Sequence, residues 1–488
     1  MKNIIFILLV AAICGCDSFL SEEPDNRLQL NNAEQIQALL VNAYPDGTWY
    51  FVEWMTDNTG KTLNNIMLSH MTEIYTFQKV RSKFQDTPTY YWTSAYRAIA
   101  HANQALISLE EIECKEDLRN ALKAEALLCR SYAHFMLVNL FAPHYDKMTA
   151  ATTPGVPYVT DVEEKLIVKY KRESVADVYK KAEADLLEGI RLKSISSEKY
   201  FPALKYHFSL QAAYAYASRF YLFTENWDEV IKYADLLLGK GYNSKYIRDY
   251  SKINKGNPTV NAQNFSAYDE QSNLMLIRKE VFADPFYRIG YRMTYDIYQQ
   301  IFFRAENDVR GLQLWIGNET KTSYYLSKFY WTLEDESYAY EIMPLFRGEE
   351  VFLNRLEALI QKNSTETLKD ADEQLEKFIT NRYGGGNQQI PFTYAHYKSQ
   401  YKSLSSGEIS GKDFYMKIIV DERRREFVQE GLRWFDMKRF ALFPVSHEDI
   451  NGNIYTLPIE KSALEIPEDA IINGLQPNYN KENVNGIK

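Results

Sequence analysis

The sequence predicts a mainly α-helical protein of paired helices, with long irregular insertions and a few short strands. Amphipathic stretches with apolar residues at helical spacing dominate the chain, such as "DLRNALKAEALLCRSYAHFMLVNLFAP" at 117–143. Several stretches follow one another closely, as the helices of tetratricopeptide-like hairpins do. If one helix covers Cys114 and Cys129, they lie about 22 Å apart, too far for a disulfide. They are predicted to be free thiols, so the core must stabilise the fold.

The N-terminus has the pattern of a lipoprotein signal peptide. Lys2 precedes an apolar run at 4–13, which as a helix spans about 15 Å, half of a bilayer core. Residues 1–15 are therefore predicted to be a cleaved signal and not a membrane span. The sequence "ICGC" resembles a bacterial lipobox, which implies that Cys16 becomes the first residue and carries lipid, including palmitate. Cys14 stands where a small residue is commoner, which leaves cleavage elsewhere open.

The N-terminal part, residues 16–242, is predicted to be a series of helices. Pro45 and Pro143 end two of them, because proline removes a helical donor and clashes with the preceding turn. Ser174 is a suitable N-cap for a third helix, and Ala213 would let two helices approach closely. The expected helices cover 32–45, 90–112, 117–143, 174–193 and 208–242, the last as two antiparallel helices joined near Thr224–Asn226.

The remainder consists of an irregular insertion and a second helical part. Residues 243–345 are rich in Asn, Tyr and Gly, show poor helical period and contain short strand-like runs. Loops on a rigid scaffold commonly carry binding residues, so this insertion is the predicted ligand-binding part. Residues 346–488 return to helical spacing at 348–361 and 370–386. No linker separates these parts, so they are expected to pack as one globular unit.

Composition and motifs exclude several classes of function. The formal net charge is −9 and no long basic run occurs, which excludes nucleic-acid binding. The seven histidines form no ligand-spaced group and no Cys-x-x-Cys occurs, so no metal site is expected. The "GGGNQ" at 384–388 lacks the Lys-Ser/Thr of a phosphate loop. The sequence therefore predicts no cofactor.

The stretch "IIVDERRREFVQEGLRWFDMKRF" at 418–440 concentrates charge among apolar residues. Glu422 with Glu426, or Glu349 with Glu350, could be nominated as the two acids of a glycosidase. A carboxylate held beside Arg stays ionised, however, and is a poor proton donor. The stretch is predicted to be scaffold, with ion pairs at helical spacing between Asp421 and Arg425, Glu430 and Arg433, and Asp436 and Arg439.

Several stretches, in order along nearly the whole chain, resemble the SusD/RagB family of Bacteroidetes outer-membrane lipoproteins. "YWTSAYRAIAHANQAL" and "KAEALLCRSYAHFMLVNLFAP" are similar to two of its helices, and "DVR" (308–310) with Lys328 to its Asp-x-Arg and Lys. "DERRREFVQEGLRWFDMKRF" resembles the signature Glu-Arg-x-x-Glu-Phe-x-x-Glu-Gly-x-Arg-x-x-Asp-x-x-Arg. The ending "LEIPEDAIINGLQPNY" is also similar, with Ala470 and Pro477 as departures.

The resemblance implies a SusD-like superhelical scaffold of four tetratricopeptide-like helix pairs without enzymatic activity. It also implies a surface protein that captures a nutrient glycan, either an oligosaccharide or a polysaccharide. The protein would pass the glycan to a SusC-like TonB-dependent transporter and would be held at the cell outer membrane by lipid on Cys16. Some relatives bind peptides, so a peptide-binding surface lipoprotein is an alternative, and a helical surface glycosidase is another.

Aromatic residues outside the helices are the predicted ligand-binding residues. The chain holds 37 Tyr, 26 Phe and 7 Trp. An aromatic ring covers the apolar face of a sugar, while Asn, Asp and Arg bond its hydroxyls. At least two candidates are expected to line one exposed site, although each could instead pack inside a loop. The candidates are Trp49, Trp54, Tyr75, Tyr287, Trp315 and Tyr338.

Overall fold

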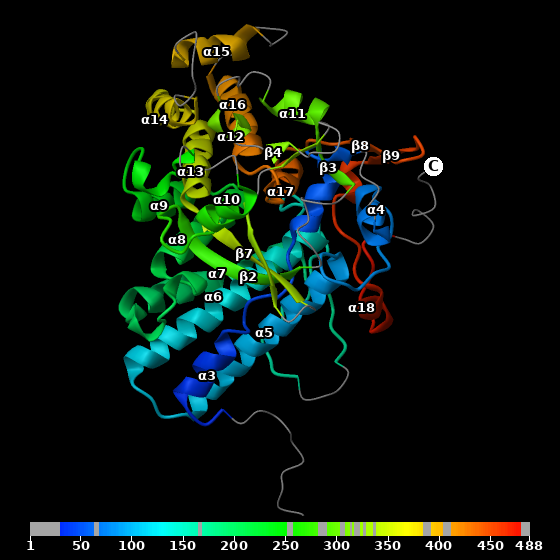
Figure 1. Cartoon of the computed structure of the whole chain (residues 1–488). Coiled ribbons are helices and arrows are strands. Elements are labelled where there is room, and N and C mark those ends of the chain that lie inside the picture. The colour runs from blue at the N-terminus through cyan, green and yellow to red at the C-terminus, as the bar shows by residue number, and fades with distance from the viewer. Residues whose placement is uncertain are drawn as a thin grey trace, which may run out of the picture.

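The computed structural model shows helices packed side by side, with a small sheet among them (Figure 1). The predicted mainly α-helical class is confirmed. One set of buried apolar residues extends from Leu30 to Leu475. The structure describes residues 30–62, 68–163, 168–250, 257–281, 290–302, 308–312, 315–316, 323–325, 328–334, 338–383, 392–403 and 411–479.

Most of the N-terminal helices form where the amphipathic pattern predicts them, and Pro143 follows the C-cap of its helix as expected. The prediction that Pro45 ends the first helix is wrong, because that helix already ends at Leu40, with Val41 as its C-cap. The Asn32 side chain caps the first, and Ser174 caps the fourth as predicted, by accepting a hydrogen bond from the amide of Asp177. Buried alanines along two of the helices, including Ala95 and Ala102, leave room for close packing. These helices are α3 (Ala33–Leu40), α5 (Pro88–Glu111), α6 (Glu116–Phe141) and α7 (Val175–Ile195).

Two further helix pairs complete the scaffold. The predicted pair in 208–242 is confirmed, with its turn at Thr224–Asn226. Its second helix packs against the first helix of the next pair, which itself packs against α16 (Figure 1). The two pairs are α8 (Leu210–Phe223) with α9 (Trp227–Leu238), and α13 (Gly348–Lys362) with α14 (Thr365–Tyr383). Three more helices follow them, α15 (Tyr394–Ser403), α16 (Gly411–Glu426) and α17 (Leu432–Arg439).

The insertion at 243–345 contains more regular structure than the sequence predicts. Strand β2 (Asn273–Val281) pairs antiparallel with β7 (Tyr338–Arg347), which pairs with β6 (Tyr330–Glu334). Strand β2 is buried along most of its length, so its side chains do not alternate between apolar and polar. Without alternation the period of a strand is not visible in the sequence.

A second sheet joins the N-terminal part to the insertion. Strand β1 (Gly60–Lys61) pairs with β3 (Tyr291–Thr294), β3 with β5 (Ser323–Tyr325), and β5 with β4 (Trp315–Ile316). The remaining elements are α4 (Ser69–Tyr75), α10 (Pro258–Phe265), α11 (Tyr295–Phe302), α12 (Val309–Leu312), α18 (Glu468–Ile472) and the hairpin of β8 (Val445–Glu448) and β9 (Ile454–Leu457).

Two sequence predictions concern single features of this fold. Cys114 and Cys129 are free thiols, as predicted, although Cys114 precedes α6 and does not share a helix with Cys129. Among the described residues, no helix has both the length and the apolar character needed to cross a membrane. Cys16 and the signal at 1–15 lie outside the described residues.

Candidate functional site

The charged stretch at 421–440 forms α16 and α17 with a tight turn between them. Gly431 adopts a φ of 72° in this turn. A Cβ at this position would lie 3.1 Å from the ring of Tyr50 and 3.2 Å from that of Trp49, so both the conformation and the space favour glycine. The amide of Gly431 donates a hydrogen bond to Glu53 at 3.1 Å, which ties the turn to the N-terminal part.

Both acid pairs nominated for a glycosidase are buried and ion-paired. Glu349 contacts Arg347 at 3.5 Å and Glu350 contacts Arg219 at 2.6 Å, while Glu422 and Glu426 lie in a larger ion network. Glu422 contacts Arg310 at 2.7 Å and Arg425 at 2.7 Å. Glu426 contacts Arg382 at 2.9 Å and Arg310 at 3.1 Å. Burial would raise the pKa of both carboxyls, but the guanidinium groups hold each pKa below its ordinary value. Both acids stay ionised and enclosed, so this network serves the scaffold.

The predicted helical ion pairs are right in one case and wrong in the others. Asp436 pairs with Arg439 at 2.9 Å, as predicted. Arg425 pairs with Glu422 at 2.7 Å instead of with Asp421. Helical spacing brings both acids near Arg425, and Glu422 is the fully buried one, so it requires the partner more strongly.

Glu430 and Arg433, the third predicted pair, bind residues from distant parts of the chain instead. Glu430 accepts from Lys328 at 2.6 Å and from Arg347 at 3.0 Å. Arg433 donates to both carboxylate oxygens of Asp57, at 2.8 Å each. The turn at Gly431 ends the helical spacing between them, so the charges connect α17 to the N-terminal part and to the insertion.

Three of the predicted ligand-binding aromatics lie in the interior. The exposed fraction is 3% for Trp49, 0% for Trp54 and 2% for Tyr75. A ring without an exposed face offers no surface to a sugar, so these three residues belong to the core in this conformation. Their role in ligand binding stays a prediction. Tyr287 lies outside the described residues. Trp315 lies in β4 and Tyr338 in β7, with side chains outside the described part of the structure.

An exposed aromatic surface nevertheless lies within the predicted ligand-binding part. Half of Tyr295 is exposed at the start of α11. Its neighbour Tyr298 is half-buried and stacks on Tyr324 of β5, with ring centroids 4.3 Å apart and planes 5° apart. Tyr324 itself is buried, at 9% exposed, and supports the two more exposed rings. The ring of Tyr324 also lies 6.2 Å from that of Tyr295. These three residues are called the tyrosine platform.

Polar groups surround the tyrosine platform. Asp296 and Gln300 are exposed on the same helix, and Gln299 is half-buried. Burial raises the pKa of Tyr298 and Tyr324, so their hydroxyls stay protonated at neutral pH and can donate. Rings flanked by amides, a carboxylate and hydroxyls match the two-sided chemistry of a sugar.

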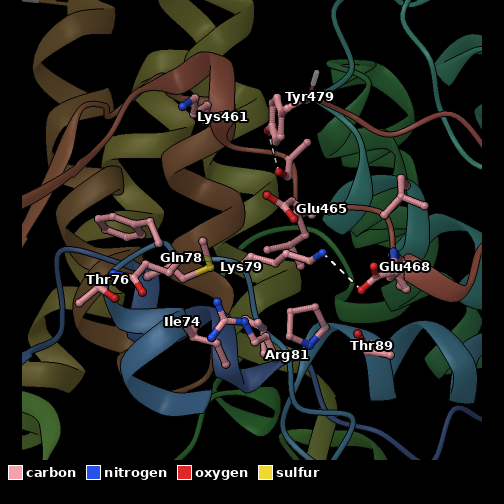
Figure 2. Close-up of a pocket in the computed structure, with 18 of the residues that line it drawn as sticks. Ile74, Thr76, Gln78, Lys79, Arg81, Thr89, Lys461, Glu465, Glu468 and Tyr479 are labelled. Carbon is pink, nitrogen blue, oxygen red and sulfur yellow. Dashed lines mark hydrogen bonds and ion pairs between the residues drawn. The ribbon is translucent and has the colours of Figure 1, made fainter. Parts of the chain in front are cut away.

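A cavity lies between the loop after α4 and the C-terminal segment. Its volume is about 780 Å³, within the range of about 300–1,000 Å³ usual for ligand sites. Residues 76–89 form one wall, and residues 455–469 with Tyr479 form the other (Figure 2). Ile74, Val80 and Leu457 supply apolar surface.

Ion pairs cross the rim of the cavity. Lys79 contacts Glu468 at 3.3 Å, and Lys83 contacts Asp469. All four side chains are at least half exposed. These pairs connect the loop after α4 to α18 at the surface, where salt and water weaken them.

Two charged side chains of the cavity lack such partners. The guanidinium of Arg81 and the carboxyl of Glu465 form no ion pair or hydrogen bond with any described residue. They come from facing walls, Arg81 from the loop and Glu465 from the C-terminal segment (Figure 2). The cavity walls partly desolvate Glu465 and raise its pKa, although Lys79 and Lys461 act in the opposite direction.

A column of stacked rings links the two surfaces. Tyr291 of β3 stacks on Tyr75 at 4.1 Å, Tyr75 on His447 at 4.3 Å, and His447 on Phe77 at 4.8 Å. Tyr291 lies in the strand that leads into α11, and Phe77 lines the cavity. Phe77 has a φ of 57°, a left-handed conformation that is uncommon for a large side chain.

The sequence alone predicted neither the tyrosine platform nor the placing of Arg81 and Glu465 in one cavity. Tyr295, Tyr298 and Phe302 follow helical spacing, but α11 is too short to show its period clearly. Arg81 and Glu465 are far apart in sequence and belong to no motif. Only the packing of the C-terminal segment on the loop after α4 brings them together.

Two family models match the chain. SusD-like_3, described as starch-binding associating with outer membrane, matches residues 18–222, and SusD_RagB, described as SusD family, matches residues 298–485. No curated protein matches significantly.

Solved structures share the fold. A SusD superfamily protein from Bacteroides vulgatus is 18% identical with a TM-score of 0.69, over 93% of this chain and 100% of its own. Another from Bacteroides thetaiotaomicron is 19% identical with a TM-score of 0.67, over 92% and 100%. Surface glycan-binding protein A from Bacteroides uniformis is 18% identical with a TM-score of 0.63, over 92% and 99%.

Proposed function

The chain belongs to the SusD/RagB family, and from this premise we propose that it binds a nutrient glycan at the cell surface and delivers it to a SusC-like TonB-dependent outer-membrane transporter. The family comprises glycan-binding, outer-membrane-associated proteins that are not enzymes. The observation that carries the proposal is the pair of family models over 18–222 and 298–485. The enclosed, ionised acids of α16 agree with a binding role, because no substrate reaches them.

The tyrosine platform is the proposed contact surface for the glycan chain. Tyr295 offers an exposed ring, and Tyr298 and Tyr324 hold an ordered stack beside it. An open surface of this kind can accept the interior of a long polymer, whereas an enclosed cavity cannot. Tyr287 and Trp315 belong to the same insertion and stay proposed contributors.

Affinity gel electrophoresis against a panel of polysaccharides tests the platform. We expect one polymer to retard the protein, and Tyr295→Ala to weaken that retention about tenfold through loss of ring stacking. Tyr268→Ala is the matched control, because 45% of Tyr268 is exposed and it stacks on Tyr206 at a separate site. Equal retention of both variants would remove the platform from the proposal. Retention of peptides but no polymer would favour the peptide-binding alternative.

Anchoring and partnership require separate tests. We expect Cys16→Ala to release the protein from outer-membrane fractions and to abolish incorporation of labelled palmitate. The wild-type protein should co-purify in mild detergent with a TonB-dependent transporter encoded beside it. A membrane-bound Cys16→Ala protein, or purification without any transporter, would contradict the corresponding part of the proposal.

A further inference from the structure

We propose that the cavity between the loop after α4 and the C-terminal segment is a second saccharide site, which takes a short, uncharged oligosaccharide or a chain end. The inference rests on the proposed function for its ligand class and adds a separate site to it. The cavity has a volume of about 780 Å³ and walls on two sides, so it suits a short ligand better than the middle of a polymer.

The charges of the cavity select an uncharged ligand. Lys79 and Lys83 are neutralised by Glu468 and Asp469 on the rim. The guanidinium of Arg81, a donor only, and the carboxylate of Glu465, an acceptor when ionised, form no ion pair or side-chain hydrogen bond with a described residue and come from facing walls. An anionic ligand would be attracted by Arg81 and Lys461 but opposed by Glu465, and a cationic ligand would meet the reverse, so the mixed charges give neither ligand a one-sided attraction, whereas an uncharged ligand meets no opposing charge.

Sugar hydroxyls satisfy both unpaired groups at once. One hydroxyl accepts a hydrogen bond from Arg81 and another donates to Glu465, and bonds to charged groups are stronger than neutral ones. The hydroxyl of Thr89, which also lines the cavity, adds a third polar contact. The half-buried rings of Phe77 and Tyr455 provide apolar surface for the C–H face of the ring.

The backbone at Phe77 gives independent support. A non-glycine residue at a φ of 57° is strained, and such strain persists where surrounding contacts hold it. Here the stack on His447, at 4.8 Å, fixes the ring at the cavity wall. The same column of rings continues to β3 beside the platform, so both surfaces lie on one rigid framework.

The test uses tri- to hexasaccharides made by partial hydrolysis of whichever polymer is retained in the gels. Isothermal titration should show binding to the wild-type protein, and Arg81→Gln and Glu465→Gln should each weaken it at least about tenfold. Thr89→Trp, which fills part of the cavity, should also weaken it. Tyr268→Ala is again the control, and thermal melting confirms that every variant folds.

The outcomes separate this inference from the proposed function. If polymer is retained but cavity variants bind the oligosaccharides as wild type does, the second site is wrong and the platform stands. If uronic-acid oligomers or tripeptides bind in the cavity more tightly than neutral sugars, the charge argument is overturned. If a polymer is retained but its oligosaccharides do not bind the wild-type protein, the second site is likewise wrong. If no polymer is retained, the proposed function itself fails.

Discussion

The ion network of α16 and α17 and the cavity beside α4 use the same residue types in opposite ways. In the network, Glu422 and Glu426 are fully buried and each contacts at least two guanidinium groups. In the cavity, the exposed guanidinium of Arg81 and the exposed carboxylate of Glu465 form no ion pair with a described residue, although the Arg81 amide donates to Glu73 at 3.0 Å and Lys79 and Lys461 lie near enough to lower the pKa of Glu465. A saturated cluster has no bonding capacity left for a ligand, whereas unpaired groups at a cavity retain theirs.

Burial explains this difference. A buried charge without a partner costs several kcal/mol, so folding requires the network to be complete. A charge exposed to water keeps its hydration and can stay unpaired until a ligand replaces that water. We therefore expect substitutions in the network to lower stability and substitutions in the cavity to lower affinity.

The largest expected loss of stability follows from removal of Glu426. Glu426→Ala leaves Arg382 and Arg310 buried without their shared carboxylate, which should cost about 3–5 kcal/mol. Urea denaturation measures this cost. Glu468→Ala is the control, because Glu468 is an exposed acid in a surface ion pair and should cost less than about 1 kcal/mol. Similar costs for both would show that the network is not the scaffold.

A buried histidine tests, with a group that is neutral in the folded protein, the rule that burial disfavours an unpaired charge. His134 Nε2 accepts a hydrogen bond from the Val159 amide, so the ring must be neutral. Burial, aided by the charges of Arg130 and Lys181, lowers the pKa of His134 to about 3 from an ordinary 6.5. Its stabilising contribution is complete above pH 6.5 and is lost as the pH falls, because only the unfolded chain then gains the proton.

The loss on acidification should reach about 3 kcal/mol at pH 4.5, two pH units below the unfolded pKa. Carboxylates with lowered pKa values add to the same trend, so the measurement is a difference between proteins. His134→Gln removes the titrating group, and its unfolding free energy should therefore fall less between pH 7.5 and 4.5. Parallel pH profiles for the two proteins would contradict the assignment.

The ion pair of Arg433 is intermediate between the fully buried network and the exposed pairs of the cavity rim, because its partner Asp57 is 34% exposed. We expect Arg433→Ala to cost about 1–2 kcal/mol, since Asp57 keeps a contact with Arg424 at 3.3 Å. Its melting temperature should fall while polymer retention stays at the wild-type level. Arg433→Lys should restore part of the loss, because lysine keeps the charge without the two parallel hydrogen bonds. A stable variant that loses retention would place Arg433 in the ligand site.

The helical scaffold could be predicted from the sequence because its signals are local. Apolar spacing, Ser174 as a cap and the turn at Thr224–Asn226 each act within a few residues. Strand β2 was less visible because it is buried on both faces. The ion pairs were mostly mispredicted because Glu430 and Arg433 choose partners through tertiary packing and not through helical spacing.

The candidate sites were harder to predict, for the same physical reason. At least two of six named aromatic candidates are predicted to line an exposed site, yet two of these candidates, Trp54 and Tyr75, are buried, since aromatic rings contribute most when they leave water. The sequence shows that the insertion is rich in tyrosine, but it contains more strands than predicted, and only its fold shows that Tyr298 stacks on Tyr324. Arg81 and Glu465 line one cavity only because the C-terminal segment packs on the loop after α4.

The smallest expected effect on stability is at the cavity rim. Lys83 and Asp469 are 64% and 60% exposed, so Lys83→Ala should cost less than about 1 kcal/mol. A double-mutant cycle between Lys79→Ala and Glu468→Ala should give a coupling energy below about 1 kcal/mol that shrinks further in 1 M NaCl. A coupling of 3 kcal/mol or more would mean that the rim is part of the scaffold. The contrast between the fully paired charges of the interior network and the charges of the cavity would then fail, because the rim pairs Lys79–Glu468 and Lys83–Asp469 would contribute to stability as the network does.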